Sequence, residues 1–206
     1  MSTDKNLNGY KSSPHIFKEI VDLIDEGSRV LDLGCGSGEL LSMLKEKKKV
    51  YATGVDIEEK MVLNCIQRGL SVFQGDLDEG LKDYETGSYD YVILSHTLQV
   101  VKRPKELLIE MLRVGKKAIV NFPNFGYMGI RLQLLFKGRM PVTKGLPYSW
   151  YDTPNIHLCT RKDFIELSKE IHAKILKEIA FNNKHRIRGP LLNARSAEVC
   201  YLITKQ

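Results

Sequence analysis

The chain lacks the cysteine patterns that mark metal-bound or disulfide-stabilised folds. It has 206 residues and four cysteines, and no two of these form a Cys-x-x-Cys pair. Spacing of this kind predicts neither a zinc site nor a disulfide framework. We therefore expect no metal site, and we expect reduced, small apolar residues at Cys35, Cys65, Cys159 and Cys200.

Long apolar runs are also missing. No stretch approaches the roughly 18 residues of a membrane span, and Met1 to Tyr10 lacks the apolar part of a signal peptide. The net charge is only +6, and the basic residues are not interleaved with aromatic ones, so the composition does not support nucleic-acid binding. We expect a cytoplasmic protein without membrane or nucleic-acid partners.

The residues that are present predict an α/β fold. A hydrophobic content of 43% can fill one sizeable core, so a single domain over residues 1–206 is expected. Strand-like and helix-like segments alternate, which favours a parallel sheet with crossover helices. The expected strands are 29–33, 50–57, 71–74, 89–94 and 117–121, closed by an antiparallel pair at 173–181 and 199–204. This order predicts a Rossmann-like, mostly parallel seven-stranded sheet with helices on both faces.

A glycine-rich turn follows the first expected strand. There Gly34, Gly36 and Gly38 alternate with other residues, and the missing Cβ atoms would let a ligand lie against the main chain. Asp56 ends the next apolar segment, where a second parallel strand would present a carboxylate to ribose hydroxyls. This order of strand, glycine turn, second strand and carboxylate predicts a nucleotide-type cofactor site. The alternative is that these glycines only tighten a turn.

The turn also indicates which cofactor fits. A dinucleotide fold has Gly-x-Gly-x-x-Gly, whereas this chain has Gly-x-Gly-x-Gly. Asp32 and Glu39 would repel a diphosphate but attract a sulfonium cation that carries an ammonium group. The turn resembles motif I of the class I S-adenosylmethionine-dependent methyltransferases. That resemblance implies binding of S-adenosylmethionine or S-adenosylhomocysteine by Asp32, Gly34, Cys35, Gly36, Gly38, Asp56, Ile57, Gly75, Asp76, Leu77 and Ser95.

One segment is longer than such a fold requires. More than thirty residues, about 124–159, separate the last parallel strand from a helix expected to begin at Thr160, and they contain an aromatic cluster around Trp150. Loops of that length are uncommon unless they are functional. The segment is expected to be a lid over the cofactor or a partner-binding insertion, and the alternative is an insertion that only packs on the sheet edge. A short helix at 129–136 is expected within it.

His96 is the catalytic candidate. It follows a buried strand, near where a substrate would meet the cofactor, and an imidazole can accept a proton from an amine or hydroxyl near neutral pH. The alternative is a histidine that is hydrogen-bonded to the backbone and holds a loop.

Six further segments resemble a narrower family, the bacterial methionine biosynthesis protein MetW. They are Asp76 to Leu81, Ser95 to Gln99, Asn121 to Gly126, Arg131 to Leu134, Gly138 to Thr143 and Trp150 to His157. The resemblance covers about residues 10–180. It implies a class I methyltransferase-like protein of methionine synthesis that is a partner or activator of a homoserine O-acyltransferase.

Whether the chain is an enzyme stays open. Many small-molecule methyltransferases carry Leu-Glu-His-Val after the fourth strand, and this chain has Leu98-Gln99-Val100-Val101 instead. The missing histidine favours a diverged function. The alternative function is an S-adenosylmethionine-dependent methyltransferase that acts on an unknown small molecule.

Overall fold

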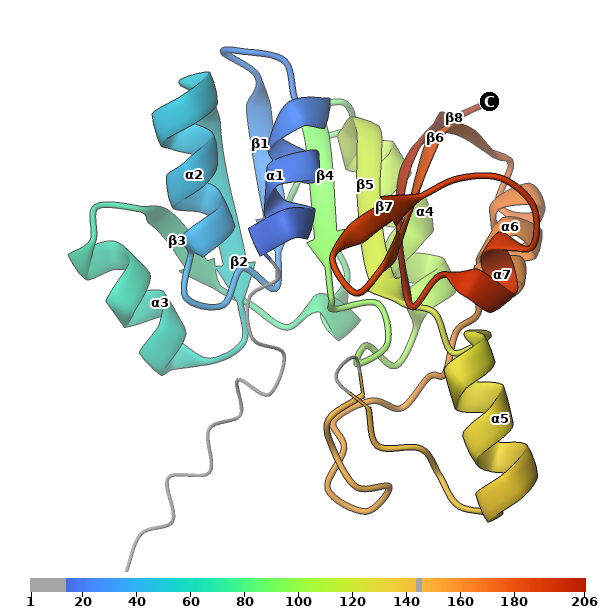
Figure 1. Cartoon of the computed structure of the whole chain (residues 1–206). Helices are drawn as coiled ribbons and strands as arrows, with labels where there is room; N and C mark the ends of the chain where they lie inside the picture. Colours follow the sequence, from blue (N-terminus) through green and yellow to red (C-terminus); the bar gives the residue numbers. More distant parts are fainter. Residues whose placement is uncertain (1–13, 144–145) are drawn as a thin grey trace, which may run out of the picture.

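A computed structural model describes residues 14–143 and 146–206, so the expectation for Met1 to Tyr10 lies outside the described residues. The described chain forms one eight-stranded sheet in the order β3-β2-β1-β4-β5-β8-β6-β7 (Figure 1). Its strands are β1 (Arg29–Leu33), β2 (Tyr51–Asp56), β3 (Ser71–Gln74), β4 (Tyr89–Ser95), β5 (Gly115–Pro123), β6 (Ala173–Asn182), β7 (His185–Ile187) and β8 (Glu198–Lys205).

The strand directions confirm the predicted fold class. Strands β1 to β5 are parallel, β8 runs antiparallel to β5, and β6 runs antiparallel to β8. The order of the strands reverses between β1 and β4. In open α/β sheets, ligands bind beyond the carboxyl ends of the strands at such a switch point.

The predicted count of seven strands is wrong by one. The chain turns back at Asn183 and Lys184, which both have positive φ angles (46° and 71°), and β7 then pairs with the end of β6. Two consecutive positive φ angles are typical of the tight turns that join twisted antiparallel strands. The polar sequence Lys184-His185-Arg186 lacks the apolar alternation of a half-buried strand, so the pattern did not reveal it.

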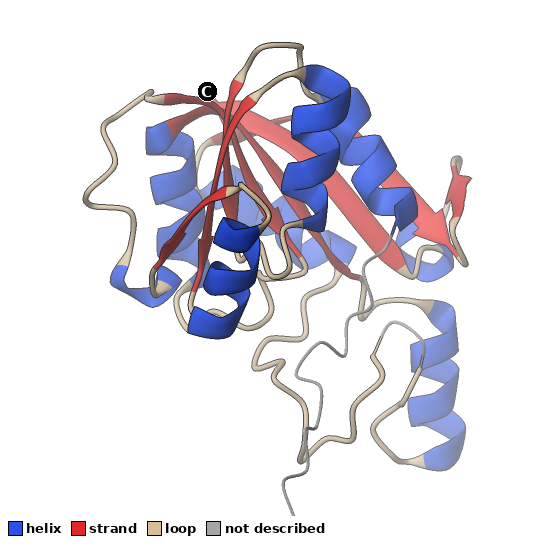
Figure 2. Cartoon of the chain, turned by 90° about the vertical axis from the view of Figure 1, so that its left-hand side faces the viewer, coloured by secondary structure: helices blue, strands red, loops and turns tan. Residues whose placement is uncertain are grey.

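Helices cover both faces of the sheet (Figure 2). Side chains alternate along each strand, so Val30 packs with α1 and α2, whereas Leu31 packs with α4 and α6. A separate small cluster joins α3 to β3. The helices are α1 (Pro14–Leu23), α2 (Glu39–Lys48), α3 (Glu59–Gln67), the 3-10 helix η1 (Leu77–Glu79), α4 (Pro104–Val114), α5 (Met128–Lys137), α6 (Arg161–Glu170) and α7 (Leu192–Arg195).

The segment between β5 and α6 contains the helix that was expected there, α5. The helix stands away from the sheet at one end of the molecule (Figure 1). The start of α6 is fixed by a capping box, in which Thr160 Oγ1 accepts from Asp163 N and an Asp163 carboxylate oxygen accepts from Thr160 N. Within the described ranges, no helix is long and apolar enough to cross a membrane.

Candidate cofactor site

The glycine turn between β1 and α2 is held against the end of β2. The backbone N–H groups of Gly34 and Cys35 both donate to the carbonyl oxygen of Val55, at 2.8 and 3.1 Å. The N–H of Gly38 donates back to the Cys35 carbonyl at 3.0 Å and closes the turn. The turn therefore lies at the carboxyl edge of the sheet, beside the switch point.

The three glycines of the turn serve two different purposes. A Cβ atom on Gly34 would lie 2.5 Å from Thr97 Oγ1, and one on Gly38 would lie 2.5 Å from Leu70 Cδ1. These two glycines allow close packing inside the protein, which corrects the idea that all three expose backbone to a ligand. A Cβ on Gly36 would meet nothing within 4 Å. Gly36 is thus the position where open space borders bare main chain, as a bound cofactor requires.

Asp56 connects the turn to the ends of two further strands. Its carboxylate accepts from Gly36 N at 2.7 Å and from Glu58 N at 3.0 Å, while its backbone carbonyl accepts from Gly75 N at 3.0 Å. These bonds fix the orientation of a buried carboxylate directly beside the open position at Gly36. The next residue, Ile57, is 64% exposed, so it offers an apolar side chain at the rim of the same site.

Asp32 adds a second buried acid. It lies in β1, and burial raises its pKa to about 7, with a further contribution from the negative charge of Asp56. The negative charge of Asp56 disfavours the charged form of Asp32, so a cation is favoured in this site. A sulfonium or ammonium group would offset this repulsion, whereas a diphosphate would increase it. The electrostatics therefore fit S-adenosylmethionine better than a dinucleotide.

The predicted adenine-contacting segment lies next to Asp56. Gly75 bonds to the Asp56 backbone, and the Asp76 carboxylate accepts from Asp78 N at 2.9 Å to start the 3-10 helix η1. Leu77 is partly buried against the main core. The structure thus brings Gly75, Asp76 and Leu77 together with the glycine turn at one edge of the sheet.

The end of β4 forms the other side of the site. Ser95 Oγ lies 3.3 Å from Asn121 Oδ1, and the backbone N–H of His96 donates to the Asn121 carbonyl at 3.0 Å. His96 has a positive φ of 55°, a conformation that non-glycine residues seldom adopt. Thr97 follows and occupies the space above Gly34. The segment with His96 therefore abuts the glycine turn.

Sequence reasoning missed the partner of His96, which is Glu198 at the start of β8. Its carboxylate lies 2.8 Å from His96 Nε2 and 3.2 Å from His15 Nε2, and it accepts from Asn121 Nδ2 at 3.1 Å. Burial opposes the charge of Glu198, but the hydrogen bonds from His15, His96 and Asn121 outweigh it and lower the pKa to about 2. No motif marks Glu198, because its partners come from three other elements of the fold.

The Glu198 pair is compatible with both interpretations of His96. The backbone and carboxylate bonds hold the loop after β4, as a structural histidine would. A carboxylate that orients an imidazole and stabilises its protonated form is also the usual partner of a histidine base.

The two ends of the segment 124–159 are hydrogen-bonded to each other, and its last part contacts the loop that carries His96. Phe125 N donates to the Cys159 carbonyl at 3.0 Å, so the two ends meet. The N–H groups of Ile156 and His157 both donate to the Gln99 carbonyl, at 2.9 and 3.1 Å, which attaches the segment to the loop that carries His96. Its aromatic cluster includes an exposed Trp150. Residues 144–145 of the segment lie outside the described residues.

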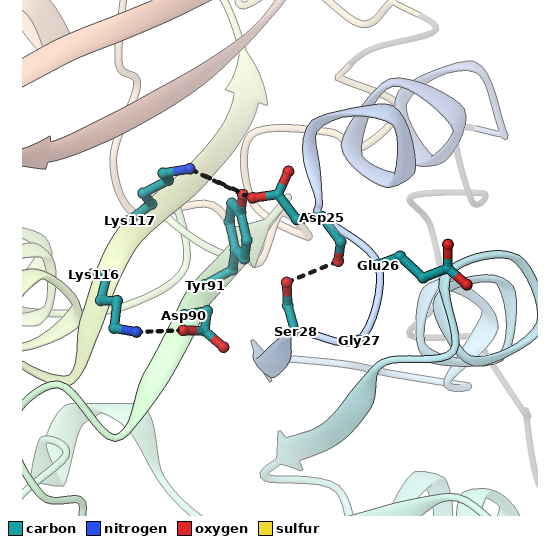
Figure 3. A pocket seen from close by; sticks show the side chains of 8 residues that line it. All are labelled: Asp25, Glu26, Gly27, Ser28, Asp90, Tyr91, Lys116 and Lys117. Atoms are coloured by element: carbon teal, nitrogen blue, oxygen red, sulfur yellow. Dashed lines mark hydrogen bonds and ion pairs between the residues drawn. The ribbon is translucent and has the colours of Figure 1, made fainter.

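A pocket of about 330 Å³ lies at the opposite edge of the sheet, among the amino ends of β1, β4 and β5 (Figure 3). Both lysines of the pocket lie beside an acid: Lys116 Nζ is 2.7 Å from Asp90 Oδ1, and Lys117 Nζ is 3.7 Å from Asp25 Oδ2. None of the predicted cofactor residues lines it. In the part of the chain that the structure describes, no group of three or more His, Cys, Asp or Glu side chains could hold a metal ion.

The strand order and strand directions define a Rossmann-like fold of the methyltransferase type. A solved S-adenosylmethionine-dependent methyltransferase from Archaeoglobus fulgidus superposes with a TM-score of 0.70 over 92% of this chain and 91% of that chain. At 18% identity, this likeness shows the fold alone. The family model described as "Methionine biosynthesis protein MetW" matches residues 15–202, and the chain belongs to that family.

Two curated relatives are similar over different lengths. The "Bifunctional methionine biosynthesis protein MetXA/MetW" of Rhodopirellula baltica is 35% identical over an alignment of 198 residues, and the match covers 89% of this chain and 32% of that protein. A "Ubiquinone biosynthesis O-methyltransferase" of Hahella chejuensis is 32% identical over an alignment of 106 residues, and the match covers 47% of this chain and 44% of that protein. The chain thus spans less than half the length of either relative.

Proposed function

We propose that this member of the MetW family binds S-adenosylmethionine and acts in the cytoplasm as a partner or activator of a homoserine O-acyltransferase. The observation that supports the cofactor most directly is the open space at Gly36 beside two buried carboxylates, Asp32 and Asp56. S-adenosylhomocysteine would occupy the same place with less electrostatic gain, because it lacks the sulfonium charge.

Each part of the cofactor has a matching group. The Asp56 carboxylate would accept hydrogen bonds from the ribose hydroxyls, and the exposed side chain of Ile57 would pack against the adenine. Asp76 and Leu77 would contact its other edge. The backbone around Gly36 would receive the methionine part, whose cationic groups Asp32 would stabilise. Cys35 and Ser95 would complete the walls of the site on either side of the glycine turn.

The proposed partner is supported by the relative from Rhodopirellula baltica, whose name joins MetXA and MetW in one chain. Fusion keeps two modules at a high effective concentration, so they meet without a strong interface of their own. In the present protein, we propose that a single domain of residues 1–206 recognises a separate acyltransferase chain through the segment 124–159. The same segment would also serve as a lid, because it is bonded to Gln99 beside His96.

A second candidate function is methyl transfer to a small molecule, and the His96–Glu198 pair favours it. Transfer from a sulfonium is an in-line displacement in which positioning supplies most of the acceleration. A base is needed only when the nucleophile carries a proton. His96, oriented by Glu198, would then accept the proton of a hydroxyl or amine.

Two measurements on the purified protein separate these functions. The first is co-purification with the homoserine O-acyltransferase of the same organism and its acyl-transfer rate with and without this chain. The second is conversion of S-adenosylmethionine to S-adenosylhomocysteine in the presence of cell metabolites, with His96→Ala as the matched variant. Complex formation without turnover supports the partner function. Turnover that requires His96, without complex formation, would replace it with the enzyme function.

A further inference from the structure

Helix α5 carries an apolar face that the rest of the described chain leaves exposed. The exposed fractions are 43% for Met128, 44% for Leu132, 74% for Leu135 and 79% for Phe136. These positions are spaced i, i+4, i+7 and i+8, so they lie on one side of the helix. Ile130 is the buried residue of α5. Four apolar side chains of α5 thus face solvent.

The base of α5 is firmly attached. Asn124, which is fully buried, precedes the helix, and its amide group forms hydrogen bonds of 2.7 to 3.0 Å to backbone groups of Gly126, Asn193, Ser196 and Arg161. Arg131 Nε also donates to the Gly126 carbonyl at 2.7 Å, which ties the first turn of the helix to this base. The apolar face is therefore presented in a fixed direction.

The helix is also complete before any partner binds. Gly138 caps its C-terminus with a φ of 56°, and the Gly138 N–H donates to the Leu134 carbonyl at 3.0 Å. Lys137 in the last turn complements the helix dipole. A preformed element loses little conformational entropy on binding, which favours α5 as a recognition element over an irregular loop.

The charge around this face indicates the kind of partner. Arg131, Lys137 and Arg139 flank the apolar positions, and the sequence from Asn124 to Tyr151 contains no Asp or Glu. A two-fold dimer would place the same basic face against itself, and like charges across an interface disfavour such pairing. The surface instead complements an apolar groove with an acidic rim on a different protein.

We infer that the outward face of α5 is the docking surface for the acyltransferase partner, bound as a helix in an apolar groove whose rim is acidic. The inference rests on the proposed function, because the identity of the partner comes from the fused relative. Leu135 and Phe136 are the central anchors, since they are the most exposed side chains of the face. Arg139 contributes electrostatic attraction at the rim.

The test is the affinity of the purified chain for the homoserine O-acyltransferase of the same organism, measured by biolayer interferometry. The double variant Leu135→Glu and Phe136→Glu should bind at least about 100-fold more weakly, because single anchors commonly account for tenfold or more. Leu63→Glu with Ile66→Glu is the matched control. These residues of α3 are 50% and 52% exposed, on the opposite side of the molecule, and their replacement should leave the affinity unchanged (Figure 1).

Salt dependence and oligomeric state complete the test. Arg139→Glu should weaken binding at least about fivefold at low salt and less at high salt, where surface charges are screened. Normal binding by the α5 double variant, with the wild type also binding, would overturn this inference alone. A wild-type chain that does not bind the acyltransferase would overturn the proposed partnership as well. If the wild type is a dimer and the double variant is a monomer, the face binds a second copy of this chain, and the inference is overturned.

Discussion

Replacing Asp32 by asparagine should make the ligand-free protein more stable while it weakens cofactor binding. The carboxylate lies inside β1, and burial with the charge of Asp56 raises its pKa from 3.8 to about 7. One pKa unit corresponds to about 1.4 kcal/mol, so at pH 8 the buried charge lowers the free energy of unfolding by about 4 kcal/mol. Asparagine keeps the shape of the side chain and removes that charge.

The effect has a defined pH dependence. The folded-state pKa of Asp32 is above its unfolded value, so between about pH 4 and pH 7 the folded chain holds a proton that the unfolded chain has released. The contribution of this group to stability therefore falls as the pH rises through that window. The stability gap between Asp32→Asn and the wild type should grow from about 2 kcal/mol at pH 5 to about 4 kcal/mol at pH 8.

Urea unfolding at pH 5 and pH 8 measures this gap directly, and thermal unfolding at pH 8 should show a rise of roughly 8 to 16 °C for a chain of this size. Calorimetric titration should show at least about tenfold weaker binding of S-adenosylmethionine, since the cation loses a charged partner. A variant that is no more stable than the wild type at pH 8, or a stability gap that is equal at both pH values, would contradict a destabilising buried charge at Asp32.

Three further predictions test separate parts of the site. Gly38→Ala should cost about 1 to 3 kcal/mol more stability than Gly36→Ala, because both glycines have a positive φ but only a Cβ on Gly38 would clash with its neighbours. Calorimetry should show that Gly36→Ala loses affinity for S-adenosylhomocysteine. The reverse order of stabilities would contradict the packing role of Gly38. Glu198→Gln should lower stability by up to about 3 kcal/mol at pH 7, because the pKa of Glu198 is lowered from 4.5 to about 2 in the folded chain. The stability that this carboxylate provides is present above pH 4.5 and is lost as the pH falls toward 2. An equal loss of stability in urea unfolding at pH 7 and pH 3 would contradict this prediction. Amide hydrogen exchange in the described parts of residues 126–157 should slow with saturating S-adenosylhomocysteine, and unchanged exchange would remove the lid function.

Local patterns in the sequence were sufficient for much of the fold. The first strand, the glycine turn and the carboxylate at the end of the second strand are contiguous signals, and each appears where its spacing predicts it, with Asp56 held beside Gly36. The closing antiparallel pair was also predicted from two apolar segments. The strand β7 was not, because a short polar edge strand is defined by its turn and its neighbour instead of by its own periodicity.

The rest of the site depends on contacts that no local pattern contains. Glu198 reaches His96 and His15 only because β8 lies beside β5, an arrangement set by the whole sheet. The packing roles of Gly34 and Gly38 likewise depend on Thr97 and Leu70, which come from other elements. The apolar positions of α5 are visible in the sequence, but a periodic pattern does not tell whether the protein covers them itself.

Binding of S-adenosylmethionine at the edge with Gly36 and Asp56 can be measured by calorimetric titration of the native protein. The matched variants are Asp56→Ala at this edge and Asp90→Ala at the opposite edge of the sheet, where Asp90 pairs with Lys116. Asp90→Ala should bind each cofactor as tightly as the native protein does. Asp56→Ala, checked to be folded by its thermal transition, should bind roughly ten- to a hundredfold more weakly. Absence of binding by the native protein, or an unchanged affinity in folded Asp56→Ala, would contradict the claim.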